Sequence, residues 1–196
     1  MLSGNCYKVK LLLEFLSIEH EWQHVDILAE EAQSDEFLSK NANGKIPLLQ
    51  IGDQEFLAES NAILNYLAEG TDWLPDGRLP RARVLQWQFF EQYSHEPYIA
   101  VARYINKYLG LPAERLEEYQ SKQADGHKAL RVMEKQLQKT DFIAGGQPTI
   151  ADISLYGYSH VAHEGGFDLA DYPAIRSWLG NFEKIPGYVQ MTDGLT

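Results

Sequence analysis

Apolar positions in the first third of the chain switch between helical and strand spacing. The apolar residues of 9–16 recur at i, i+3, i+4 and i+7, which predicts a helix with one buried face. Trp22–Leu28 carries β-branched residues typical of a strand. In chain order, the sequence predicts a helix over 9–16, a strand over 22–28, a short helix capped by Ser34, a hairpin of strands over 46–51 and 55–58, and a helix after Ser60. This order is typical of an α/β unit with a mixed sheet.

The chain changes character after residue 70. Residues 70–80 hold two glycines and two prolines, a composition typical of a linker. Strand signals then almost vanish, and helical patterns cover 81–109 with an interruption near Pro97, 114–139, 149–163 and 173–185. We therefore expect an α/β plus all-α fold, with a first domain over residues 1–70, a linker over 71–79 and an all-helical domain over 80–196.

Charge and composition exclude several classes of function. The 196 residues include 17 Lys and Arg against 28 Asp and Glu, a formal charge of −11 that repels the phosphate backbone of nucleic acids. Cys6 is the only cysteine, so neither an intrachain disulfide nor a multi-cysteine zinc site is possible. We find no run of 18 apolar residues and no signal peptide, so we expect a soluble cytoplasmic protein without membrane contact.

Polar residues run directly into the first predicted helix. The segment Ser3-Gly4-Asn5-Cys6 places hydroxyl and amide groups beside the N–H groups of a helix start, which favour an anion. An ordinary N-cap by Ser3 or Asn5 explains the same pattern. We expect Cys6 to face the core, since small buried cysteines are common.

Two further motifs flank the predicted hairpin. In Gly44-Lys45-Ile46-Pro47, a proline at a strand entry lies where no ladder donor is needed. A cis peptide there leaves the backbone of Ile46 for a ligand, and a trans turn before an edge strand is the alternative. Glu59 and Ser60 begin the next helix, where Ser60 can meet an anionic group and Glu59 an ammonium. Capping by Ser60 alone is again the alternative.

Two features of the second half have a structural interpretation. Thr149 and Asp152 have the spacing of a capping box, with Asp in place of Glu or Gln. His160 and His163 lie three residues apart with Glu164 adjacent, a spacing that can place ligands on one helix face. No third ligand is evident and the order is not His-Glu-x-x-His, so we expect no metal.

The ordered set of motifs resembles a cytosolic glutathione transferase over essentially the whole chain. The serine at the helix start, Lys-Ile-Pro, Glu-Ser and the Pro-Thr-Ile-Ala-Asp cap follow in the order of that family. The resemblance implies a thioredoxin-like first domain, a helical-bundle second domain, a homodimer and glutathione as co-substrate. Within the family, the chain is similar to the bacterial members with a theta- or delta-like serine. The resemblance also implies that Pro47 is cis.

The same resemblance implies roles for individual residues. Ser3 matches the catalytic serine that activates the thiol, and Asn5 is the alternative donor. Glu59 and Ser60 would hold the γ-glutamyl end of glutathione. The backbone of Ile46, next to Pro47, would pair with the cysteinyl part, and Lys45 would face the glycyl carboxylate.

One departure from the family concerns the start of the chain. Family members begin with a central strand before the serine, whereas this sequence starts at Met1-Leu2. We therefore expect the first strand to be missing, through a truncation or a mis-set start. Ser3 would then lie on a poorly fixed terminus, which weakens its expected catalytic role.

The resemblance implies attack of the glutathione thiolate on a small hydrophobic electrophile. His95, Tyr98 and Tyr104 are the candidate wall of the electrophile pocket, and helix packing is the alternative for each. A glutathione-dependent disulfide or peroxide reductase is a second candidate function, and it is favoured if Asn5 is the main thiolate donor. A non-catalytic interaction module on the same fold is the third.

Overall fold

The computed structural model describes residues 2–193, which form two compact units. Among the described residues, the first unit holds residues 2–69 together with residues 186–193, and the second spans Gly70–Ile185. The sequence pattern predicts a helical domain that extends to residue 196, whereas residues 186–193 group with the first unit. Tyr7 Oη donates to the carbonyl oxygen of Val189 at 2.8 Å, so this segment is bonded to the first helix.

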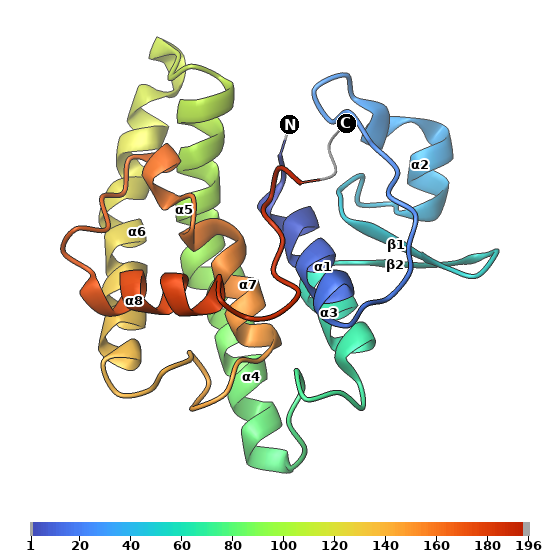
Figure 1. The fold of residues 1–196 in the computed structure, drawn as a ribbon. Coiled ribbons are helices and arrows are strands. Elements are labelled where there is room, and N and C mark those ends of the chain that lie inside the picture. The colour runs from blue at the N-terminus through green and yellow to red at the C-terminus, as the bar shows by residue number, and fades with distance from the viewer. Residues whose placement is uncertain (1, 194–196) are drawn as a thin grey trace. The chain divides into compact units, whose positions relative to one another are not determined.

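The first unit packs two helices side by side along a β-hairpin (Figure 1). Its core joins Val9 and Leu13 to Ile63, with partly buried leucines from the hairpin packed against them. The predicted hairpin is confirmed, since its two strands pair antiparallel. The elements are α1 (Gly4–Phe15), η1 (Glu31–Gln33), α2 (Asp35–Lys40), β1 (Leu48–Ile51), β2 (Glu55–Ala58) and α3 (Ser60–Ala68). Ser34 caps α2 as predicted, because its Oγ accepts the N–H of Phe37 at 3.3 Å.

The predicted strand over Trp22–Leu28 is wrong. The segment is irregular in the structure, with Trp22 42% and Leu28 55% exposed. The sheet within residues 2–193 contains β1 and β2 alone, so no neighbouring strand satisfies the backbone groups of this segment. For the same reason the expected mixed sheet is replaced, in the described residues, by one antiparallel pair.

The second unit is helical. Its elements are α4 (Arg78–Phe90), η2 (Glu91–His95), α5 (Glu96–Arg103), η3 (Tyr104–Tyr108), η4 (Ala113–Arg115), α6 (Leu116–Leu137), α7 (Ile150–Ser159), η5 (Ala162–Gly165) and α8 (Pro173–Phe182). The predicted interruption near Pro97 corresponds to η2, a π-helical turn, and Pro97 lies in the first turn of α5 where a missing N–H costs little. None of the helices in the described part of the chain is long and apolar enough to cross a membrane.

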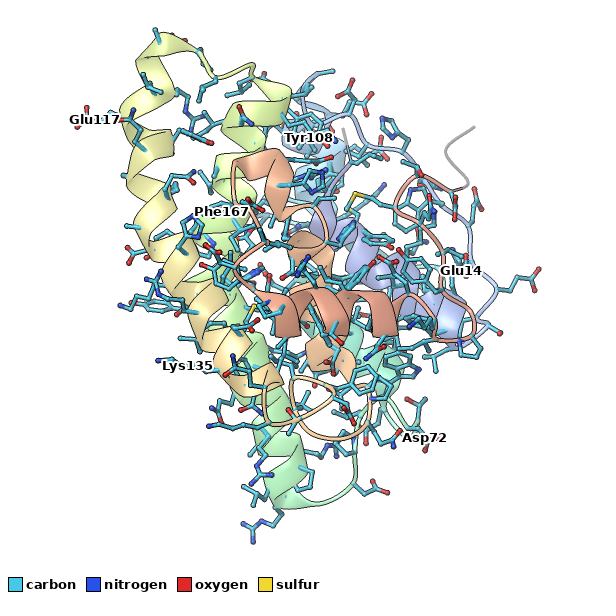
Figure 2. The ribbon with its side chains drawn as sticks, turned by 60° about the vertical axis from the view of Figure 1, so that its left-hand side comes forward. Glu14, Asp72, Tyr108, Glu117, Lys135 and Phe167 are labelled. Atoms are coloured by element: carbon cyan, nitrogen blue, oxygen red, sulfur yellow. The ribbon has the colours of Figure 1, made fainter. Side chains whose placement is uncertain are left out.

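Phe167 is a large aromatic residue buried within the helical unit. The side chain, labelled in Figure 2, is fully buried. A Cβ atom on Gly126 of α6 would lie 2.3 Å from the Phe167 ring, well inside van der Waals contact. The glycine therefore lets α6 approach a large aromatic side chain that a substituted residue would displace.

The capping box predicted at the start of α7 is confirmed. Thr149 Oγ1 accepts the N–H of Ala151 at 3.3 Å, and Asp152 Oδ2 accepts the N–H of Thr149 at 2.9 Å. Asp152 is fully buried, and burial raises the pKa of its carboxyl to about 6 although four hydrogen bonds to it act in the opposite direction. This motif therefore fixes the start of α7 from inside the unit.

Candidate functional site

Two of the predicted motifs meet at one end of the hairpin. β1 begins directly after Pro47, and β2 ends directly before Glu59. Leu48 pairs with Ala58, so the same register places Pro47 across from Glu59. The Ile46–Pro47 peptide bond is cis, as the resemblance implies. The hairpin therefore brings together two segments that lie a dozen residues apart in the chain.

Ser60 connects this end of the hairpin to the start of α1. Its Oγ donates to Oδ1 of Asn5 at 3.4 Å, a bond between residues 55 positions apart. Ser3 is the N-cap of α1, and its Oγ accepts the N–H of Cys6 at 3.3 Å. The starts of α1 and α3 thus lie side by side, and each presents the polar residues that the sequence singled out.

The backbone of Glu59 adopts an unusual conformation. Its φ is 68° and its ψ is 111°, in a region that a residue with a side chain seldom occupies. Glu59 is the N-cap of α3 without a side-chain cap bond, and Ser60 is the first helical residue, so the simple capping alternative for Ser60 is wrong. Such strain costs about 1–3 kcal/mol and is typically found at ligand sites. The Glu59 side chain is exposed and can reach a ligand.

A short loop ahead of β1 is held by two side chains that the sequence interpretation missed. Asn41 Nδ2 donates to the carbonyl oxygen of Lys45 at 2.7 Å, and Gln33 Nε2 donates to that of Gly44 at 3.0 Å. Gly44 has a φ of 60°, and a Cβ there would lie 2.6 Å from the Gln33 amide. The left-handed backbone and the close approach of the Gln33 side chain therefore favour glycine at this position. The turn motif Asn-x-Asn-Gly at residues 41–44 is the sequence feature that could have predicted this role of Asn41.

Lys8 is a further residue of this site that the sequence pattern did not indicate. Its side chain is fully buried, and its Nζ donates to Oδ1 of Asn5 at 2.7 Å. It lies between the buried residues Tyr7 and Val9 of α1, whereas a lysine usually extends its charge to solvent. A polar group at the start of the helix, Asn5, is what the buried ammonium contacts instead.

Cys6 is not a reactive thiolate in this structure. Burial raises the pKa of its thiol to about 11, against a smaller opposing effect of its hydrogen bond with Ser3. The thiolate is the nucleophilic form, so this thiol is inert at neutral pH. The sequence expectation that Cys6 packs rather than reacts is consistent with this environment.

The three residues predicted for the electrophile wall all lie in the second unit, in different environments. His95 is fully buried, with Nε2 2.9 Å from Oγ of Ser159, so it has no surface for a ligand in this structure. Tyr98 and Tyr104 are half-buried and keep accessible surface. The ammonium of Lys122 lies 5.9 Å from the ring centroid of Tyr98.

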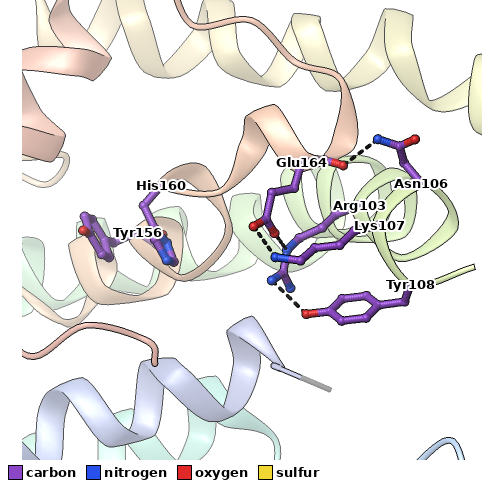
Figure 3. A network of polar contacts seen from close by, with 7 residues as sticks. All are labelled: Arg103, Asn106, Lys107, Tyr108, Tyr156, His160 and Glu164. Atoms are coloured by element: carbon purple, nitrogen blue, oxygen red, sulfur yellow. Dashed lines mark hydrogen bonds and ion pairs between the residues drawn. The ribbon is translucent and has the colours of Figure 1, made fainter. Parts of the chain in front are cut away.

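Close to Tyr104, a network of charged groups is centred on Glu164 (Figure 3). Arg103 Nε lies 2.5 Å from Glu164 Oε2, and Lys107 Nζ pairs with the other carboxylate oxygen. Arg103 also donates to the Tyr108 hydroxyl at 3.0 Å. Burial alone would raise the pKa of Glu164, but Lys107 and Arg103 more than offset this and lower it. The Glu164 carboxylate is therefore ionised at neutral pH and forms ion pairs with Arg103 and Lys107.

Of the two histidines considered as metal ligands, His160 is engaged in packing, whereas His163 is exposed. The His160 ring stacks on Tyr156 with centroids 4.8 Å apart, and its Nδ1 lies 2.8 Å from the Tyr156 carbonyl oxygen. Burial lowers the pKa of His160 to about 4, so the ring is neutral. Within residues 2–193 there is no group of three or more His, Cys, Asp or Glu side chains that could hold a metal ion.

The fold and the site define a class of protein: a small unit with a cis-proline loop and polar helix starts, followed in the chain by a helical unit. Comparison with protein families identifies it. The family model for the N-terminal domain of glutathione S-transferase matches residues 2–69, and that for the C-terminal domain matches residues 114–181. The chain belongs to the glutathione S-transferase family.

Individual relatives agree with this assignment. A glutathione S-transferase structure from Pseudomonas fluorescens has 57% sequence identity and a TM-score of 0.96, covering 97% of this chain and 95% of that one. A glutathione transferase structure from Burkholderia graminis, with two glutathione molecules bound per subunit, has 26% identity, a TM-score of 0.85 and coverages of 99% and 85%. The disulfide-bond oxidoreductase YfcG of Escherichia coli is 29% identical over 93% of this chain and 87% of its own length.

Proposed function

We propose that this protein is a glutathione transferase that joins the glutathione thiolate to small hydrophobic electrophiles. The observation that carries the proposal is the convergence of Ser60 and Asn5, linked at 3.4 Å, beside the cis Ile46–Pro47 loop. The N–H groups of two helix starts, next to the backbone of this loop, offer donors to a short anionic peptide. Relatives with bound glutathione support this ligand.

Glutathione carries two carboxylates and one ammonium, and each has a candidate partner. The exposed Glu59 carboxylate suits the ammonium, and Ser60 with its backbone N–H suits the γ-glutamyl carboxylate. The backbone of Ile46 would pair with the cysteinyl part, and Lys45 would face the glycyl carboxylate. Because the chain carries a net charge of −11, these local donors rather than the overall field must bind an anion.

The thiol needs modest stabilisation of its anion. A thiol with a pKa of about 8.5 is only a few per cent ionised at neutral pH. Lowering that pKa by about two units requires ~2.7 kcal/mol. A hydroxyl bond from Ser3 to the charged sulfur supplies about 1.5–3 kcal/mol, and the start of α1 adds about 0.3–1 kcal/mol. No metal or general base is required for this step.

We assign the electrophile contacts on the helical unit to Tyr98 and Tyr104. Both rings keep accessible surface and suit an apolar or aromatic acceptor. His95 belongs to the interior of the unit and would act only by supporting the helix that carries Tyr98.

We further propose a cytoplasmic homodimer. Leu85, Phe89 and Tyr93 follow one another at four-residue spacing and are exposed, which leaves an apolar stripe along α4 and η2. A second copy of the chain is the occupant that the family favours. Sedimentation equilibrium tests this: wild type should be dimeric and Phe89→Glu should be monomeric, whereas a monomeric wild type contradicts the proposal.

Glutathione-dependent disulfide reduction is the second candidate function. The similarity to the disulfide-bond oxidoreductase YfcG favours it, as does the well-anchored amide of Asn5. Such an enzyme exchanges thiols and disulfides through a mixed disulfide, so it requires an accessible glutathione sulfur. Activity on disulfides without activity on electrophiles would select this function over conjugation.

Calorimetric titration with glutathione, followed by assays on electrophiles and disulfides, tests the proposal. Ser60→Ala should weaken binding by about 1–3 kcal/mol, because a hydrogen bond to a charged group is lost. Glu59→Gln should also weaken binding, whereas Glu55→Gln, an exposed change on the same hairpin, should not. A wild-type protein that does not bind glutathione would contradict the assignment.

A further inference from the structure

A fully buried lysine contacts the candidate site from inside the first unit. Lys8 lies one helical turn after Asn5 on α1, and its Nζ donates to Asn5 Oδ1 at 2.7 Å. Ser60 Oγ reaches the same oxygen from α3 at 3.4 Å. Two donors from different helices therefore converge on one acceptor at the start of α1.

This convergence fixes the orientation of the Asn5 carboxamide. A carboxamide has an acceptor at one end and two N–H donors at the other, and a lysine ammonium can only donate. The oxygen end must therefore face Lys8, which leaves the amide nitrogen as the end that a ligand can meet. Asn5 is half-buried, whereas Lys8 and Ser60 are buried, so the nitrogen end is the more accessible one.

Lys8 is the stronger of the two anchors. The Lys8–Asn5 bond is charge-assisted and 0.7 Å shorter than the Ser60–Asn5 bond, from 3.4 and 2.7 Å. A glutathione carboxylate at the start of α3 would also compete for the Ser60 hydroxyl proton, and Lys8 would then hold Asn5 alone. The positive charge of the Lys8 ammonium, which contacts the amide oxygen of Asn5, polarises the carboxamide and makes its N–H groups better donors.

Resting on the proposed function, we propose that Lys8 is a positioning residue for glutathione activation. It orients and polarises the Asn5 amide so that the amide donates to the glutathione sulfur. Lys8 itself does not touch the ligand. In this arrangement Ser3 and Asn5 supply two donors from the first turn of one helix, and the lysine behind them determines the contribution of the second.

The test is a thiolate absorbance titration of the glutathione complex. Lys8→Met should raise the pKa of the bound thiol by about one unit, a tenfold loss of thiolate at a given pH below that pKa. Lys10→Met is the matched control: it removes the same charge from α1, but Lys10 donates to the carbonyl of Asp193 instead. It should leave the thiol pKa unchanged.

A double-mutant cycle separates positioning from a structural effect. Asn5→Ala should raise the thiol pKa by itself, and adding Lys8→Met to it should change nothing further. Equal effects of Lys8→Met in both backgrounds would overturn the proposal, as would a Lys8→Met protein that titrates like Lys10→Met.

If Lys8→Met does not fold, Lys8→Gln decides the question. It keeps a donor without the charge and should give a smaller rise that vanishes with Asn5→Ala; a wild-type pKa in Lys8→Gln would overturn the proposal.

Failure of the proposed function would be visible separately. A wild-type complex whose glutathione thiol titrates like that of free glutathione contradicts thiol activation itself. A wild-type complex with a lowered thiol pKa, together with a Lys8→Met variant that leaves this pKa unchanged, contradicts only the role of the lysine.

Discussion

Trp178 donates its indole N–H to the carboxylate of Asp152 at 3.0 Å, and the two residues lie 26 positions apart. The same carboxylate oxygen accepts the N–H of Ile143 at 2.7 Å, while the other accepts both the N–H and the hydroxyl of Thr149. One buried side chain therefore forms hydrogen bonds with α8, with the loop that precedes α7 and with the start of α7. Its four donors are all protein groups, so each depends on the carboxylate for its hydrogen bond.

Asp152→Asn should destabilise the protein by at least about 2 kcal/mol, because the new amide turns donors toward groups that also donate and leaves them unsatisfied. Asp168→Asn is the control. Its side chain accepts one backbone N–H at the surface, so the loss should stay below about 1 kcal/mol. Urea unfolding of both variants measures the difference, and equal losses would contradict a central role for Asp152.

Asp152 should also contribute to the pH dependence of the free energy of unfolding. With a folded pKa of about 6 against 3.8 in the reference state, Asp152 binds more protons when folded across that interval. Its contribution to the free energy of unfolding is thus fully present below about pH 4 and falls as the pH rises to about 6. Asp152→Asn should remove this slope, and a slope that persists would assign it to another group.

Glu164 should show the opposite behaviour. Its pKa is lowered in the folded protein, so the stabilisation is present at neutral pH and is lost as the pH falls through the folded pKa. Glu164→Ala should cost about 3–5 kcal/mol, because it leaves the buried Arg103 guanidinium without its carboxylate. Lys107→Ala, at the exposed side of the network, should cost below about 1 kcal/mol. Comparable losses for the two variants in thermal unfolding would contradict this ranking.

The part of the fold predicted from sequence is the part encoded by neighbouring residues. The hairpin around Gly52 and the capping box of Thr149 were predictable because turn and cap chemistry acts within a few positions. Trp22–Leu28 was predicted wrongly, because a strand also needs a partner and the described residues supply none. Local preference cannot report whether a partner exists.

The candidate site divides in the same way. Ser3, Asn5 and Ser60 could be singled out because each lies at the start of a helix, but only the hairpin register and the Ser60–Asn5 bond bring them together. Lys8 could not be predicted, since its position between Tyr7 and Val9 gives no sign that its ammonium turns inward to an amide. The burial of His95 was equally invisible, because it depends on contacts with α7, about 60 residues further along the chain.

Gly126→Ala should destabilise the helical unit by about 1–3 kcal/mol, because the added methyl overlaps the buried Phe167 ring and forces it to move. Gly180→Ala on α8 is the matched control. Nothing lies within 4 Å of a Cβ there, so the change should be neutral or should stabilise by up to about 1 kcal/mol through helix propensity. Circular dichroism melting distinguishes them, and an undisturbed Gly126→Ala protein would show that Phe167 relaxes freely.

Ser3 provides the decisive test of the thiol site. As N-cap of α1 its oxygen accepts the N–H of Cys6, which leaves its proton to donate to a glutathione sulfur. Ser3→Ala should raise the pKa of the bound thiol by about one to two units, since a bond worth about 1.5–3 kcal/mol is lost at 1.36 kcal/mol per unit. Ser39→Ala, an exposed change on α2, should leave it unaltered. If Ser3→Ala has no effect while Asn5→Ala raises the pKa, the sulfur is held by the amide, and the disulfide reductase function moves ahead of conjugation.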